Sequence, residues 1–181
     1  MVKATTILKF IGPTIYLNLF FLLEITSQAQ TCDCSGLVDV KSKVLIEILD
    51  KPGGHSVGTF QNDQKNENFL VFDLLASDQG YFKVSIQYSI NGKAKVGWVR
   101  KGDYLGTYMS NYAEGTTLNF YSQPDQNATV STSIHKWYNA FYTILDCNGT
   151  WVKVIATLNG KDYSGWIEGK WLCPNPYSTC N

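Results

Sequence analysis

The chain has 181 residues, of which 17% are charged and 14% are aromatic, and its 15 basic and 15 acidic residues cancel. A zero net charge argues against proteins that bind nucleic acid or anionic membranes through a strongly basic total charge. The length is sufficient for one moderate hydrophobic core or two small ones.

The N-terminus has the pattern of a secretory signal peptide. Two lysines in the first nine residues precede an apolar stretch at 10–23, and Ser27-Gln28-Ala29 offers small residues for cleavage before Gln30. The alternative is an uncleaved membrane anchor, but the stretch is interrupted by Pro13 and is shorter than the roughly 20 apolar residues of a span. We therefore expect residues 1–29 to be removed, which leaves a secreted or periplasmic protein without a stable membrane span.

All of the cysteines follow this segment, at Cys32, Cys34, Cys147, Cys173 and Cys180. In an oxidising compartment, disulfides are the expected state. Cys173 and Cys180 bracket the last few residues and are expected to staple the C-terminal tail. Cys147 is expected to pair with Cys32 or Cys34, which leaves one cysteine free or bonded to another molecule. We expect no metal, because Cys32 and Cys34 are too close in sequence for the usual zinc pair.

The first half of the chain reads as β structure after a polar leader at 30–42. Alternating apolar residues, turn signals and a polar loop at 61–68 separate short β-rich segments. Asn91-Gly92 is a strong hairpin signal. The predicted strands of this half cover residues 43–49, 56–60, 69–75, 81–90 and 95–100.

The second half repeats this plan after a tyrosine-rich stretch at 102–115, and residues 109–116 are predicted as a linker. Asn159-Gly160 again marks a hairpin. No amphipathic segment is long enough to predict a helix. The predicted strands of this half cover residues 117–121, 129–134, 140–145, 151–158 and 163–168.

Residues 46–108 and 118–172 carry the same four anchors in the same order, so the chain is predicted to be a duplication. Five short strands per copy favour a small closed barrel, because closure removes exposed strand edges. The predicted fold is all-β, with two small barrels in tandem at 43–108 and 117–173, followed by a tail at 174–181. The repeat favours two separate hydrophobic cores.

These motifs resemble the bacterial SH3 domain, and the chain resembles a tandem pair of them. The resemblance rests on residues 118–124 and 149–154, on the Asn-Gly hairpins, and on Gly97-Trp98 and Gly165-Trp166. Glu47 and the polar loop at 61–68 depart from the family pattern, as do Leu49 and Tyr121, which replace an arginine. The resemblance implies a cell-wall binding module that recognises the peptide stems or cross-bridges of peptidoglycan. Independently of the family, each glycine before tryptophan is expected to permit a close approach on a crowded strand.

No catalytic motif is present. Cys147 and His135 could in principle be a nucleophile and its base, but we interpret them as a disulfide cysteine and a surface histidine. We therefore expect a binding protein that is not an enzyme and has no cofactor. The alternative is a module for an exported protein partner (an inhibitor, immunity or scaffold protein), which the polar loop at 61–68 and the replaced arginine favour. Ligand contacts concentrate at aromatic residues in loops and at strand ends. The candidates are Tyr81, Tyr104, Tyr121, Trp137 and Tyr138.

Overall fold

The protein is all-β, with thirteen strands and one short 3-10 helix in the described residues. The computed structural model describes residues 29–178 and Cys180, so the predicted signal peptide lies outside the described residues apart from Ala29. The strands of the first half are β1 (Gln30–Val38), β2 (Ile46–Leu49), β3 (Ser56–Phe60), β4 (Leu70–Asp78), β5 (Tyr81–Tyr88) and β6 (Lys95–Arg100). The second half contains β7 (Leu105–Met109), β8 (Leu118–Tyr121), β9 (Val130–Ile134), β10 (Tyr142–Asn148), β11 (Trp151–Leu158), β12 (Lys161–Glu168), η1 (Gly169–Trp171) and β13 (Leu172–Cys173).

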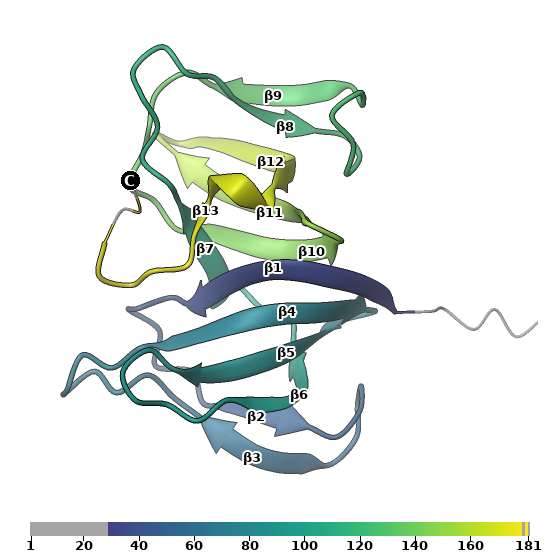
Figure 1. The fold of residues 1–181 in the computed structure, drawn as a ribbon, viewed down its shortest axis with the longest axis vertical. Coiled ribbons are helices and arrows are strands. Elements are labelled where there is room, and N and C mark those ends of the chain that lie inside the picture. Colours follow the sequence, from purple (N-terminus) through teal and green to yellow (C-terminus); the bar gives the residue numbers. More distant parts are fainter. Residues whose placement is uncertain (1–28, 179, 181) are drawn as a thin grey trace, which may run out of the picture.

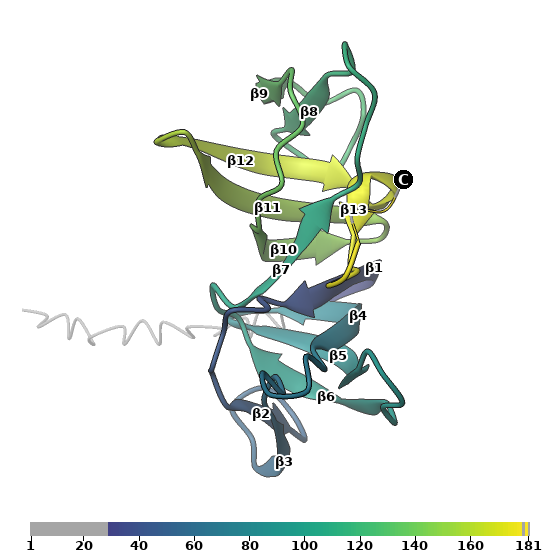
Figure 2. The same cartoon turned by 90° about the vertical axis from the view of Figure 1, so that its left-hand side faces the viewer.

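The strands form one antiparallel path with the order β3-β2-β6-β5-β4-β1-β7-β10-β11-β12-β8-β9, and β13 pairs with β7 beside it. This order is a palindrome, because β1 to β6 on one side match β7 to β12 on the other. Figures 1 and 2 show the first repeat below and the second above, with β1 and β7 between them and the β2–β3 and β8–β9 hairpins at opposite ends.

The duplication extends to the pairing register. Lys83 pairs with Trp98 in the first repeat, and Lys153 pairs with Trp166 in the second. Both β4 and β10 carry a bulge at the corresponding position, between Leu74 and Ala76 and between Ile144 and Asp146. Sequence anchors that are local in the chain therefore mark residues that are equivalent in space.

Two strands correct the sequence-based expectation. The segment expected as a polar leader forms β1, and the tyrosine-rich stretch between the repeats contains β7, so each repeat has six strands instead of five. Neither segment has a clear apolar alternation that would predict a strand. Each is a strand because it pairs with other strands on both of its edges. Their conformation comes from long-range pairing instead of local pattern.

The two repeats join through the edges of β4 and β10, which a closed barrel would have paired within its own repeat. β1 takes the edge of β4, β7 takes the edge of β10, and the two then pair with each other at Leu37–Gly106 and Val38–Leu105. The path stays open at β3 and β9, so backbone hydrogen bonds in the described residues do not close a barrel. One hydrophobic cluster runs through both repeats, where the sequence favoured two separate cores.

The glycines before Trp98 and Trp166 lie where strands cross closely. A Cβ on Gly97 would lie 2.3 Å from Cγ2 of Ile48, and a Cβ on Gly165 would lie 2.8 Å from Cβ of Phe120. Real Cβ atoms do not come so close to their neighbours, so only glycine fits without movement. The next residue, Trp166, is buried, and Trp98 is half-buried. These positions serve packing between β2 and β6 and between β8 and β12.

Candidate ligand-binding site

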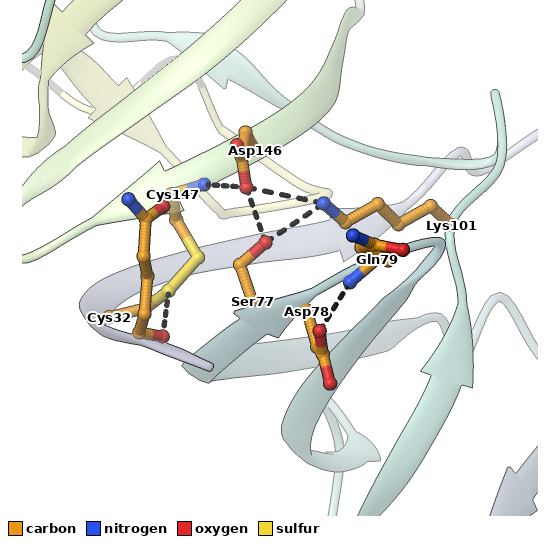
Figure 3. A network of polar contacts seen from close by, with 8 residues as sticks. Cys32, Ser77, Asp78, Gln79, Lys101, Asp146 and Cys147 are labelled. Carbon is orange, nitrogen blue, oxygen red and sulfur yellow. Dashed lines mark hydrogen bonds and ion pairs between the residues drawn. A yellow bond between two sulfur atoms is a disulfide. The ribbon is translucent and has the colours of Figure 1, made fainter. Parts of the chain in front are cut away.

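A polar cluster joins the two repeats beside β1 (Figure 3). Ser77 at the end of β4 donates a hydrogen bond to Oδ1 of Asp146 in β10. Lys101 Nζ donates to Ser77 Oγ at 2.8 Å and to Asp146 Oδ1 at 3.2 Å. A serine beside a lysine can act as a nucleophile and its base. Here Ser77 is only 5% exposed and Asp146 engages both groups, so the cluster holds the repeats together.

The disulfide Cys32–Cys147 crosses the same joint (Figure 3). Of the two pairings expected for Cys147, the structure forms the one with Cys32. Two backbone bonds flank it, from Asp33 N to Gly149 O at 2.7 Å and from Gly149 N to Thr31 O at 2.8 Å. The first strand of repeat one is thereby fixed to the β10–β11 hairpin of repeat two.

Cys34 is the free cysteine among the described residues, and it is buried with 8% of its surface exposed. Its thiol lies 3.5 Å from Gly149 O. Burial raises the pKa of this thiol from 9.0 to about 11. The thiolate is the reactive form of cysteine, so Cys34 is held in its unreactive form at neutral pH.

We expect Cys34 in the folded protein to react with iodoacetamide about 100-fold more slowly at pH 8 than a cysteine of unshifted pKa. The raised pKa lowers the thiolate fraction, and burial adds to the protection. Intact-mass measurement of labelling over time checks the rate, and urea-unfolded protein, which should label rapidly, is the control. Rapid labelling of the folded protein would contradict the assignment.

The same shift has a defined effect on stability. Because the unfolded chain releases the Cys34 proton at lower pH than the folded protein, this thiol stabilises the fold below pH 9.0. That contribution is lost as the pH rises toward about 11.

The C-terminal tail is a closed loop that reaches the first repeat. Cys173 and Cys180 form a disulfide, which confirms the predicted staple. The hydroxyl of Tyr177 lies 2.7 Å from Glu67 O and 2.8 Å from Ser89 Oγ. Its ring centroid lies 5.9 Å from that of Phe69. The tail begins on the second repeat at β13 and makes these contacts with the first.

A pocket of about 210 Å³ opens between this tail, β7 and the segment after β9. Trp137 is fixed at its edge, because its Nε1 donates to Met109 O at 3.2 Å. Burial raises the pKa of Tyr108, so its hydroxyl stays a neutral donor at physiological pH. We call this the junction pocket, and its lining is Tyr108, Met109, Trp137, Asn139, Asn175, Pro176, Tyr177 and Ser178.

The described residues that line the junction pocket have no charged side chains. Three aromatic rings provide flat apolar surface, while two asparagine amides and the hydroxyls of Tyr108 and Ser178 provide hydrogen-bond donors and acceptors. The Tyr177 hydroxyl is engaged with Glu67 and Ser89 instead. Among the described residues that line the pocket, none carries a carboxylate, amine or imidazole. Such a lining suits a neutral ligand that carries amides or hydroxyls on an apolar framework.

Trp137 also borders a second, wider hollow with a different character. This hollow has a volume of about 510 Å³, and its lining includes an acidic and two basic side chains, Glu114, His135 and Lys136. All three are exposed. It adjoins the junction pocket through the shared tryptophan and contains charges of both signs.

The structure separates the five aromatic residues predicted from the sequence. Trp137 lines the junction pocket, and Tyr138 follows it with its hydroxyl accepting from Asn159 Nδ2 at 3.2 Å. Tyr121 packs edge-on against Trp151, with centroids 5.6 Å apart.

The two candidates of the first repeat lie around Arg100 instead. The Arg100 guanidinium lies 5.7 Å from the centroid of the Tyr81 ring. The hydroxyl of Tyr104 donates to Arg100 O at 2.6 Å. The five aromatic residues therefore do not form one binding face.

Sequence reasoning predicted Trp137 and missed the other seven described lining residues. The tyrosine-rich stretch and the cysteines around the tail were visible signals for all of these except Asn139. Nothing in the sequence indicates that these segments meet.

Within residues 29–178 and Cys180, no cluster of histidine, cysteine, aspartate and glutamate is arranged to hold a metal ion. No helix in that part of the chain is long and apolar enough to cross a membrane.

No protein-family model matches the chain, and no curated protein matches it. Among solved structures, the chain is similar to NlpC1 from Trichomonas vaginalis, with a TM-score of 0.32 and 21% sequence identity. The match covers 85% of this chain and 50% of the other, so the chain spans half the length of that protein. A TM-score this low defines no shared fold, and the likeness assigns no function.

Proposed function

We propose that the chain is an exported, non-catalytic binding module that recognises peptidoglycan through the junction pocket. The observation that carries this proposal is the uncharged lining of aromatic rings, amides and hydroxyls. Sugar rings stack on aromatic side chains, and the hydroxyls and amides of a glycan or peptide stem match asparagine amides. The two disulfides fit an oxidising compartment, such as the outside of the cell or the periplasm.

The proposal includes the family suggested by the sequence motifs. Each repeat is proposed to be an SH3-like unit on the basis of its sequence motifs. The matching strand order and register of the two repeats support the duplication. In this interpretation the units are curved but open, because β1 and β7 join them into one path.

The alternative of an exported protein partner was favoured by the replaced arginine and by the polar loop at 61–68. In the structure this loop is engaged within the molecule. Asn62 is buried, accepts a bond from Leu70 N at 2.9 Å and donates to Asp39 O at 2.9 Å. Gln64 donates to Val40 O at 2.7 Å. No observation on this loop favours a partner, and a protein ligand becomes an outcome of the test below.

Trp137→Ala is expected to raise the Kd for purified peptidoglycan about tenfold or more, because it removes the largest aromatic surface of the pocket. Asn139→Asp should weaken binding as well, since it places a charge among neutral groups. Co-sedimentation over a range of protein concentrations measures both effects.

Asn127→Asp is the matched control, because it adds the same charge to an exposed loop outside the pocket. Its Kd should equal that of the unmodified protein. If saturating peptidoglycan retains none of the protein, peptidoglycan is not the ligand, and exported proteins should be screened. If all three variants bind as tightly as the unmodified protein, the junction pocket is not the binding site.

A further inference from the structure

One wall of the junction pocket is anchored differently from the others. β7 lies within the sheet, and Trp137 is bonded to it. The wall made by residues 175–178 instead belongs to a loop that leaves the sheet after β13. Its base is held by the Cys173–Cys180 disulfide. The position of its tip depends on other contacts.

Tyr177 supplies the contacts of the tip with the first repeat. Its hydroxyl meets Glu67 O at 2.7 Å and Ser89 Oγ at 2.8 Å, and its ring lies against Phe69. These partners belong to the loop before β4 and to the turn after β5. The side chain nevertheless remains 51% exposed. A half-exposed residue contributes little to the core, so its contacts affect where the loop lies more than whether the protein folds.

We propose that Tyr177 is a positioning residue that sets the shape of the junction pocket by tethering the disulfide loop to the first repeat. Binding then depends on both repeats, although no residue from β1 to β6, or from the loops between them, lines the pocket. For its effect on affinity this inference rests on the proposed function, whereas the tether itself can be tested without a ligand.

Ser89→Ala is the most informative variant, because Ser89 contacts Tyr177 and does not line the pocket. Tyr177→Phe removes the hydroxyl and keeps the ring against Phe69. Each change is expected to speed hydrogen exchange of the amides of Asn175, Tyr177 and Ser178 by about three- to tenfold, because one or two hydrogen bonds are lost. Because both remove the same contact, the effects in the double variant should be less than additive.

The same variants should raise the Kd for purified peptidoglycan about three- to tenfold while the Tm stays within about 2 °C of the unmodified protein. Tyr163→Phe, a half-buried tyrosine outside the pocket, is the matched control and should change neither exchange of these amides nor affinity.

Unchanged exchange at 175–178 in both Ser89→Ala and Tyr177→Phe would overturn the tether. Faster exchange with unchanged affinity would overturn the positioning role. If the unmodified protein fails to bind peptidoglycan, the proposed function is wrong, and the exchange result alone then decides the tether.

Discussion

Removing the Cys32–Cys147 disulfide is expected to lower the free energy of unfolding by up to about 5 kcal/mol. The bond closes a loop of 115 residues, and the entropy that a cross-link removes from the unfolded chain grows with loop length. It also fixes β1 to the second repeat at the joint. Because domains are stable by roughly 5–15 kcal/mol, this loss removes a large part of the total.

Urea unfolding of Cys32→Ser/Cys147→Ser measures this loss. Cys173→Ser/Cys180→Ser is the matched comparison, because its residues are separated by 7 positions and the same relation gives about 2 kcal/mol. Equal losses for the two double variants would contradict the assignment of Cys32–Cys147 as the bond that stabilises the joint.

Gly165→Ala is expected to lower the free energy of unfolding by about 3 kcal/mol. The new Cβ would lie 2.8 Å from Phe120 Cβ and 2.9 Å from Tyr121 O, so β8 would have to move away from β12. Gly97→Ala should have a similar effect in the first repeat, where the new Cβ would meet Ile48 and Leu49 O. Thermal or urea unfolding measures both.

Gly160→Ala separates steric overlap from backbone strain. Gly160 has a φ of +76°, and its Cβ would meet nothing within 4 Å. This variant should therefore lose only the cost of a left-handed backbone, about 1 kcal/mol. Gly165 itself has a φ of +155°, so part of its loss is backbone strain, whereas Gly97 has no positive φ and isolates the steric overlap. A loss for Gly160→Ala as large as that for Gly97→Ala would contradict close packing as the reason for the glycines before the tryptophans.

A strand could be predicted from the sequence where the residues that define it are close to it in the chain. β3, β6 and β11 have the bounds expected from the sequence, because local turns and apolar alternation delimit them. β1 and β7 were missed, because each is defined by strands that are distant in the chain. A polar sequence such as that of β1 becomes a strand when both of its edges are paired.

The candidate site was predictable in only one of its parts. Trp137 was expected, because an aromatic residue in a segment between strands is a common ligand contact. Its neighbours in the pocket come from β7 and from the tail. Their contribution depends on the β13–β7 pairing and on Tyr177 reaching Ser89, which are contacts between residues far apart in the chain.

The sequence by itself determined the all-β class, the duplication and the staple at Cys173 and Cys180. These properties depend on local signals, namely turn residues, apolar alternation and short spacings. The tertiary structure alone decided that Cys147 pairs with Cys32 and leaves Cys34 free, that the two repeats share one core, and that a pocket forms at their junction. The physical reason is that β1 and β7 take the edges on which each repeat could otherwise have closed, and that choice is set by the packing of the whole chain.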